Sequence, residues 1–445
     1  MMTDNDPNAD DSSMNRRPIL KTVAAGGATA VLAGCIGGGD GGDGGNGDGN
    51  DGSSDGDDGS SDSGGGGATY DVGLVNPYSG DLAPFADRND RGSDLALSEI
   101  NNESVAGGKI NKITADSETT SNAGVSASQK LVNQEGVDVL TGPCSSGVAV
   151  SIAESVTIPN EITHIMINST APGITDLEDN GYVLRSCPSD AFQGQALAQV
   201  VSDNDISSVS LIVVNNDYGQ GLADAFQKRY KELGNTVETT IPAEQGRSSY
   251  SAQLNEADNP NSEGIVFIVY PQSFQTMIRE AYQMGIQENY EIFGAESMVS
   301  DEVEQNVDPV AINGMKGTNP SPPIESEVYQ TFAEEFQNEY DRQPTVWAAY
   351  AYDAYMMLGL AIHSAGEYSS DAVANAIYEI SRPEGTEVSS IAEGKSELDA
   401  GNAINYQGAS GNVNLDENGD PSGSYQHWEV IDGTFEMQGF VDTGQ

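Results

Sequence analysis

Hydroxyl side chains cluster after two neighbouring strands predicted within residues 137–172. Ser145 and Ser146 follow the first β-branched run, and Ser169 and Thr170 follow the second. A helix between the runs makes this a βαβ unit, so both strands end at the same edge of a parallel sheet, where ligands bind. The first pair also opens the helix, whose free N–H groups favour an anion. The stretch predicts a small-anion pocket; the alternative is that these residues are ordinary helix caps and turns.

The elements that would position these residues form two alternating series. Strands alternate with helices through residues 70–186, and a second series, with a continuous apolar strand at 265–270, runs to residue 319. This alternation predicts an α/β protein with two Rossmann-like lobes, joined by crossing segments, with a ligand cleft between them. We expect the N-terminal lobe to contain residues 68–187 and 320–385, and the C-terminal lobe to contain residues 188–319 and 386–445.

Three side chains of the second series fall at the expected cleft mouth. Tyr218, Tyr270 and Glu296 each lie at or just after the end of a predicted strand, and the carboxyl ends of parallel strands face the ligand. A glutamate there is either a partner for a cation or an ordinary solvated loop residue, because most charged side chains are exposed.

A targeting segment is predicted at the N-terminus. Arg16 and Arg17 precede the apolar run 22–33, which is shorter than the roughly 20 residues that a membrane span needs. The run ends in Leu-Ala-Gly-Cys35, so residues 1–35 resemble a Tat export signal with a lipobox, in which Cys35 carries a lipid; the alternative is a plain anchor with a chance cysteine. Residues 36–67, almost all Gly, Asp, Ser and Asn, are predicted to be a disordered tether. We therefore expect a protein anchored by lipid to the outer face of the cytoplasmic membrane.

The chain is strongly acidic. Its 69 Asp and Glu against 18 Lys and Arg give a formal charge of −51, which excludes nucleic-acid binding of the ordinary basic kind. Self-repulsion of this size strains a compact fold in dilute buffer and is screened in concentrated salt, so the composition is typical of a salt-loving organism.

Enzyme and metal signatures are missing from the sequence. It contains neither H-E-x-x-H nor a Walker A motif, so we expect no enzyme, no cofactor and no metal. Residues 416–420 resemble the start of a calcium loop. However, Pro421 and His427 stand where a Gly and a Glu are required, so a turn is expected instead.

Short motifs in a fixed order link the chain to a known family. The motifs are Asn-Pro-Tyr-Ser-Gly-Asp at 76–81, Gly-Pro-Cys-Ser-Ser at 142–146, Asn-Ser-Thr-Ala-Pro-Gly at 168–173, Arg-Ser-Cys-Pro-Ser-Asp-Ala-Phe-Gln-Gly at 185–194, Asp-Tyr-Gly-Gln-Gly at 217–221, Val-Tyr-Pro at 269–271, Phe-Gly-Ala-Glu at 293–296 and Tyr-Ala-Tyr-Asp-Ala at 350–354. Together they resemble the substrate-binding lipoproteins of branched-chain amino acid ABC transporters, which have the type I periplasmic-binding fold, and the resemblance covers nearly all of residues 68–441.

The resemblance implies a role for each candidate residue. It places the ligand carboxylate on Ser145 or Ser146 and on backbone N–H groups that include that of Thr170. It places the ammonium group on the Ser169 carbonyl, the Thr170 hydroxyl and the Glu296 carboxylate. The residues that it implies as the lining of the closed cleft are Tyr270, Tyr218, Phe85 and Phe192.

Two functions from different classes remain open. The first is a solute-binding protein, expected to be monomeric, that delivers a small amino acid, in the first place a branched-chain one, to an ABC permease and its ATPase. The second is a ligand-sensing receptor module for amides, urea or related solutes. If Cys35 carries a lipid, Cys144 and Cys187 are left either as free thiols or as a disulfide.

Overall fold

The computed structural model describes residues 67–441. The expected signal, the lipidated Cys35 and almost all of the expected tether lie outside these residues. Within 67–441, no helix is both long and apolar enough to cross a membrane. The same range holds no group of three or more His, Cys, Asp or Glu side chains arranged to bind a metal ion.

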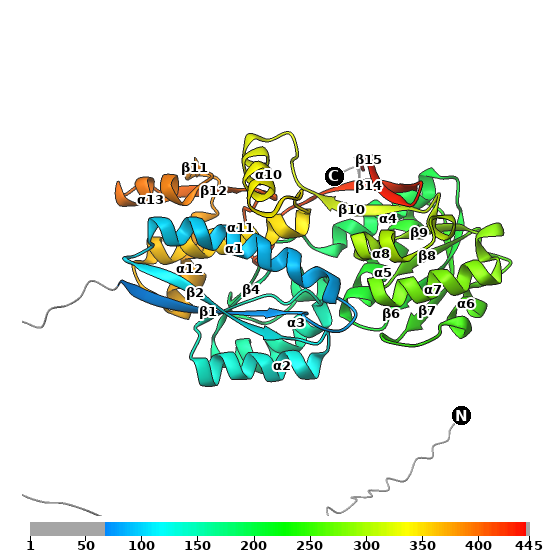
Figure 1. Cartoon of the computed structure of the whole chain (residues 1–445), viewed down its shortest axis with the longest axis horizontal. Coiled ribbons are helices and arrows are strands. Elements are labelled where there is room, and N and C mark those ends of the chain that lie inside the picture. The colour runs from blue at the N-terminus through cyan, green and yellow to red at the C-terminus, as the bar shows by residue number, and fades with distance from the viewer. Residues whose placement is uncertain (1–66, 442–445) are drawn as a thin grey trace, which may run out of the picture. The chain divides into compact units, whose positions relative to one another are not determined.

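The first lobe is built on a five-stranded parallel sheet in the order β2-β1-β3-β4-β5 (Figure 1). Strands β3, β4 and β5 are short and buried along their whole length, as expected for a parallel sheet covered on both faces. The elements are β1 (Ala68–Asn76), α1 (Ala86–Glu103), β2 (Gly108–Asp116), α2 (Ser121–Lys130), β3 (Val139–Thr141), α3 (Ser146–Ile152), β4 (Thr163–Met166) and β5 (Val183–Arg185).

The second lobe has a seven-stranded sheet in the order β15-β14-β10-β9-β8-β6-β7. Strands β6 to β10 pair in parallel, whereas β14 and β15 form an antiparallel hairpin at one edge. The elements are α4 (Asp190–Asp203), β6 (Ser208–Val214), α5 (Asp217–Glu232), β7 (Thr236–Ala243), α6 (Ser251–Ala257), β8 (Gly264–Ile268), α7 (Pro271–Met284), β9 (Glu291–Gly294), α8 (Asp301–Asn306), α9 (Pro309–Ile312), β10 (Lys316–Ser321), β14 (Ser424–Ile431) and β15 (Thr434–Phe440).

The remaining elements return to the first lobe. Helix α11 is buried over nearly its whole length and packs on α1, and a small three-stranded sheet in the order β11-β12-β13 lies beside it. The elements are α10 (Glu327–Tyr340), α11 (Val346–Ala365), α12 (Ser370–Ile380), β11 (Thr386–Val388), α13 (Ile391–Asp399), β12 (Ile404–Gly408) and β13 (Gly411–Asn412).

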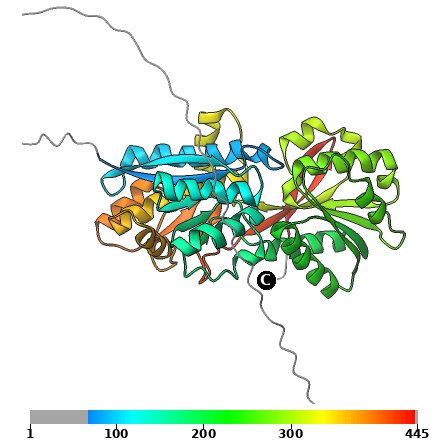
Figure 2. The same cartoon turned by 90° about the horizontal axis from the view of Figure 1, so that it is seen from below.

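This arrangement corrects the expected lobe boundary at residue 385. Ile391, Ile404 and Tyr406 are buried in the core of the first lobe together with α11, because the apolar side chains of this segment cover that helix. Residues 386–412 therefore belong to the first lobe. Only the hairpin of β14 and β15 near the chain's end lies in the second lobe, where Figure 2 shows it in red.

Three segments cross between the lobes, at residues 186–189, 322–326 and 413–423. A buried arginine at the end of β5 holds the third of these segments: the Nε of Arg185 donates to Asp420 Oδ1 at 2.5 Å. Its Nη1 donates to the backbone carbonyls of Thr170 and Ala171. Asp420 belongs to the 416–420 segment, where Asp416 accepts hydrogen bonds from two backbone N–H groups, so the expected turn is confirmed.

Candidate ligand-binding site

The candidate site lies where the loops at the carboxyl ends of the two sheets face each other. The two lobes enclose a cavity of ≈ 20 Å³, which has room for about one water molecule. An amino acid is larger, so the lobes have to separate before one can enter. The lining residues are Leu82, Phe85, Arg88, Cys144, Asn168, Thr170, Tyr218, Tyr270, Glu296, Ser297 and Trp347.

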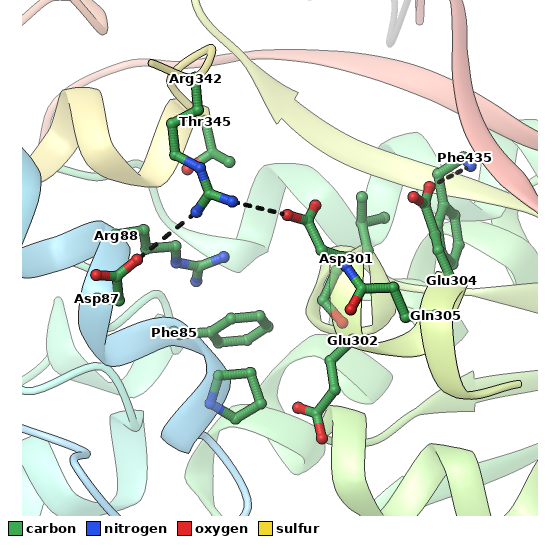
Figure 3. A pocket seen from close by; sticks show the side chains of 13 residues that line it. Phe85, Asp87, Arg88, Asp301, Glu302, Glu304, Gln305, Arg342, Thr345 and Phe435 are labelled. Carbon is green, nitrogen blue, oxygen red and sulfur yellow. Dashed lines mark hydrogen bonds and ion pairs between the residues drawn. The ribbon is translucent and has the colours of Figure 1, made fainter. Parts of the chain in front are cut away.

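Direct contacts between the lobes hold this closed state. The hydroxyl oxygens of Ser145 and Tyr270 lie 3.1 Å apart, and Ser273 on α7 donates to the carboxylate of Asp81 in the loop after β1. Near the rim, the guanidinium of Arg342 lies 3.5 Å from Asp301 on α8 (Figure 3). All three contacts have to break when the cleft opens.

The hydroxyls of the first lobe are engaged within the protein. Ser146, the first residue of α3, accepts hydrogen bonds with its Oγ from the backbone N–H groups of Thr170 and Ala171, both at 3.1 Å. Ser169 donates its hydroxyl to the Pro143 carbonyl at 2.8 Å. In this state both serines hold the two loops together, and Ser169 does not line the cavity. Among the hydroxyls expected in the pocket, Thr170 lines the cavity directly.

Thr170 is hydrogen-bonded to Asp190, a residue that the sequence analysis did not predict in the site. Its Oγ1 donates to Asp190 Oδ2 at 2.7 Å, and Asp190 is fully buried at the start of α4, with Ser189 as the helix N-cap. Burial raises the pKa of Asp190 well above its ordinary value, and the nearby Glu296 raises it further. Two carboxyl groups therefore share this end of the site.

Glu296 lies directly after β9 and is only 4% exposed. Burial raises its pKa from 4.5 to about 7, while hydrogen bonds to its carboxylate act in the opposite direction. One of these comes from the Gln193 side-chain amide on α4. A buried carboxylate that lines this cavity is suited to a ligand cation, since neither group is then buried alone.

Two tyrosines of the second lobe line the cavity beside Glu296. Tyr218 is the second residue of α5, whose N-cap is Asn216, and its hydroxyl donates to Ser297 Oγ at 2.9 Å. Its ring stacks on that of Tyr270, with the centroids 5.6 Å apart. Asn216 also donates to the Tyr270 hydroxyl at 3.0 Å. The structure thus brings together Ser145, Tyr218, Tyr270 and Glu296 from separate loops.

The two phenylalanines differ. Phe85 is buried and lines the cavity, as expected. Phe192 does not: its side chain is 40% exposed and is not among the lining residues. The reason is the helical rotation of α4, which turns the adjacent Gln193 inward and Phe192 outward. The expectation that Phe192 lines the closed cleft is therefore corrected.

The sequence analysis missed Arg88 and Trp347, which both line the cavity. Arg88 follows Phe85 by three residues, so the two share a face of the chain at the start of α1. The guanidinium carbon of Arg88 lies 3.5 Å from the centroid of the Phe85 ring and 5.0 Å from that of Trp347. An arginine in such an acidic chain is expected at the surface, and Arg88 belongs to no short motif that would have indicated a place in the cleft.

Cys144 and Cys187 are both buried and both carry free thiols in the structure. Burial raises the pKa of each thiol. The alternative of a disulfide between them is not realised here.

Comparison with known proteins gives the family. Residues 91–433 match the sequence model of the receptor family ligand-binding region. The chain belongs to this family. The model describes a ligand-binding region, which agrees with the expectation that the chain binds a solute.

The chain is similar to proteins whose names refer to chemotactic signalling and to amino acid binding. The chemotactic signal transduction system substrate-binding protein BasB of Halobacterium salinarum is 24% identical over 391 residues, which is 85% of this chain and 91% of that protein. The Leu/Ile/Val-binding protein BraC3 of Rhizobium johnstonii is 28% identical over 240 residues, 53% of this chain and 63% of that protein. The expected resemblance to branched-chain amino acid binding proteins is confirmed.

Solved structures of other proteins share this fold. The leucine-binding protein LivK of Thermotoga maritima has a TM-score of 0.73 at 24% identity and covers 84% of this chain and 99% of its own. The substrate-binding protein LivJ of Streptococcus pneumoniae, solved with isoleucine, has a TM-score of 0.70 at 21% identity with the same coverage. The expected fold class, two α/β lobes of the type I periplasmic-binding kind, is confirmed.

Proposed function

We propose that the protein is the extracytoplasmic solute-binding protein of an ABC importer, which captures a small amino acid by closure of its cleft. The observation that carries the proposal is Glu296, a buried carboxylate facing the hydroxyl-bearing loops of the other lobe. An amino-acid zwitterion needs an anionic partner for its ammonium group and hydrogen-bond donors for its carboxylate. The names of the relatives, Leu/Ile/Val-binding proteins among them, support a branched-chain ligand.

The contacts suggest how capture proceeds. When the cleft opens, the hydrogen bond between Ser145 and Tyr270 breaks. The Ser145 hydroxyl on the first lobe is then free to bind the ligand carboxylate. The ammonium group then lies between Thr170 and Glu296. Closure of the second lobe excludes water, which strengthens both interactions. The closed form is the one that the permease and its ATPase receive.

The anchoring of the protein is part of the same proposal. Cys35 carries a lipid that holds the protein on the outer face of the cytoplasmic membrane, and the segment that follows lets one monomeric body reach its permease. The support is the Leu-Ala-Gly-Cys sequence behind the twin arginine.

A signalling output is the second candidate, and the name of the BasB relative favours it. In that case the closed form docks on a transducer and not on a permease. Both candidates share the capture step and differ only in the partner.

The capture step is tested by calorimetry in molar KCl with leucine, isoleucine, valine, acetamide and urea. We expect saturable binding of the amino acids and none of the uncharged solutes. Binding of acetamide or urea alone would refute the amino-acid proposal.

A further inference from the structure

Two asparagines of the chain stand in the sequence Asn-x-Ser/Thr, the acceptor signal for a glycan on the asparagine side chain. One is Asn102, which is followed by Glu and Ser, and the other is Asn168, which is followed by Ser and Thr. The sequence alone does not distinguish the two signals. Their surroundings in the folded protein differ, and this difference determines which of them an enzyme can reach.

The signal at Asn168 is closed off inside the first lobe. Asn168 lies in the loop after β4 and is only 4% exposed. Its side-chain amide donates to Asn89 Oδ1 at 2.5 Å. The hydroxyl two positions later is engaged as well, because Thr170 donates it to Asp190. Neither the acceptor nitrogen nor the hydroxyl of this signal is available in the folded protein.

Asn102, by contrast, is exposed near the end of α1. The preceding Asn101 is fixed to the backbone of Ile110, where it both donates and accepts a hydrogen bond. The next helical position is rotated by about 100°, so it faces away from β2. Within residues 67–441 the Asn102 side chain makes no hydrogen bond, so its amide nitrogen is available to a reactant.

The backbone leaves the helix inside this second signal. Ser104 follows α1 with φ 55° and ψ 128°, and Ala106 and Gly107 have φ values of 45° and 74°. A left-handed backbone cannot continue a right-handed helix, so the Ser104 hydroxyl lies on an irregular turn. The residue between acceptor and hydroxyl, Glu103, is held only by Lys395, at 3.6 Å between the charged groups. Helix ends fray, and a surface ion pair adds little stability, so the signal can adapt to an enzyme while the lobe stays folded.

Asn102 is also remote from the ligand cavity. Helix α1 begins directly after Phe85, which lines the cavity, and Asn102 lies near the other end of its 18 residues, about 24 Å away at 1.5 Å per residue. That end of the first lobe is where β1 and β2 begin, with Ala68 paired to Gly108 (Figure 1). A group attached to Asn102 would lie beside the start of β1 and leave the cleft free to close.

We propose that Asn102 carries an N-linked glycan and that Asn168 does not. The donor is a glycan joined through a phosphate to a membrane lipid. The side-chain nitrogen of Asn102 bonds to the anomeric carbon of the sugar and loses one proton, while the bond between that carbon and the phosphate oxygen breaks. The lipid phosphate leaves with the electron pair of that bond, so no oxidant or reductant is needed.

This inference rests on the proposed location of the protein on the outer face of the membrane. A twin-arginine signal suits a chain that folds before export, so an enzyme on the outer face meets the folded surface. Exposure in the fold therefore selects between the two signals. The attached sugars are bulky and hydrophilic, and they would keep this end of the first lobe hydrated.

The test is a peptide map of the full chain, purified from the membranes of the cells that naturally make it and digested with trypsin. Trypsin releases residues 92–109, which include Asn102, and residues 131–185, which include Asn168. We expect the first peptide to be heavier by the mass of one or more sugar residues, with fragment ions that locate this mass on Asn102 and not on Asn101. The second peptide should have its unmodified mass.

Three variants made in the same cells test the signal itself. Asn102→Gln removes the acceptor, and Ser104→Ala removes the hydroxyl while Asn102 stays in place; both should lose the glycan completely. Glu103→Gln is the matched control, because it removes the contact with Lys395 but keeps the signal, and it should retain the glycan. Exposed positions tolerate substitution, so a cooperative melting transition in molar KCl should show that each variant is folded.

The outcomes separate this inference from the proposed function. An unmodified Asn102 in protein whose Cys35 carries a lipid overturns the glycan and leaves the proposed anchoring standing. A glycan on Asn168, or one that persists on Asn102 in Ser104→Ala, overturns the inference as well, because attachment then follows neither exposure nor this signal. Protein recovered inside the cell with neither lipid nor glycan overturns both the inference and the proposed location.

Discussion

Replacement of Glu296 by glutamine tests the proposed binding chemistry most directly. The substitution keeps the shape of the side chain and removes only its charge. The oxygen of the new side-chain amide can still accept the hydrogen bond from Gln193. The N–H group of the new amide can donate to Gln193 Oε1, which has no hydrogen-bond partner in the structure. We therefore expect Glu296→Gln to fold as the parent does, so that a loss of affinity reports on the ligand's ammonium group.

The size of the loss follows from the burial of the carboxylate. Glu296 is only 4% exposed, and removal of one partner from a buried charge pair costs about 2–5 kcal/mol, or roughly 30- to 5,000-fold in affinity. This holds at pH 8.5, where a carboxyl with a pKa of about 7 is ionised before the ligand arrives.

The pH dependence has a definite sign. Because the pKa of Glu296 is raised to about 7, the free protein is protonated there below pH 7, and the ammonium group has to displace that proton. Affinity of the parent should fall as pH falls, by up to about tenfold per pH unit and about 100-fold by pH 5. Arg88, whose pKa burial lowers to about 10, stays charged over this range.

Calorimetry in molar KCl at pH 5, 7 and 8.5, with two buffers of different ionisation enthalpy, measures affinity and proton release together. We expect parent and Glu296→Gln to differ most at pH 8.5 and to converge toward pH 5. Glu302→Gln is the matched control, since Glu302 lines the neighbouring pocket shown in Figure 3 and does not line the ligand cavity, and it should bind as the parent does. The reasoning is refuted if Glu296→Gln binds leucine as tightly as the parent at pH 8.5, or if the difference does not shrink with falling pH.

Three further predictions concern stability and processing. Because a charge of −51 is screened only in salt, the body from residue 68 onward should unfold in low-salt buffer and refold near molar KCl; an unchanged melting temperature between about 0.1 and 3 M salt would contradict this. Cys35→Ser should block lipidation and release the protein from membranes, and intact mass of the parent should show the lipid; an unmodified N-terminus in the parent would count against it. Arg185→Met leaves the carboxylate of Asp420 without its buried partner and should lower the free energy of unfolding by about 3–5 kcal/mol in a urea titration; a loss below about 1 kcal/mol would show that the crossing segments are held by other contacts.

The fold could be predicted from the sequence wherever a strand carried its own signal. The buried β-branched runs and their exit loops identified the parallel strands of both sheets, because such strands are apolar on both faces. The segment 386–412 gave no comparable signal. Its strands are short, and whether Ile404 and Tyr406 join one lobe or the other depends on the apolar surface of α11, which is fixed only by tertiary packing.

The site was predictable to the extent that its residues followed strand ends. Glu296, Tyr218 and Tyr270 were found in this way. Phe192 was misplaced because one helical position decides whether a side chain points into the cleft or away from it. Arg88 was missed because the cavity that it lines also includes Trp347, more than 250 positions away in the sequence, and no local pattern records that proximity.

The pairing of β10 with β14 has a consequence for how the chain is made. These strands are neighbours in the second sheet, yet the whole α10–β13 segment of the first lobe is synthesised between them. Until residues 424–431 leave the ribosome, β10 is an unpaired edge strand, the kind of surface that invites association with other chains. The first lobe therefore cannot be completed before β13 has been made, and the second sheet cannot be completed before β14 and β15 have been made. A chaperone that covers the exposed edge of β10 in the meantime would protect the growing chain at its most vulnerable point.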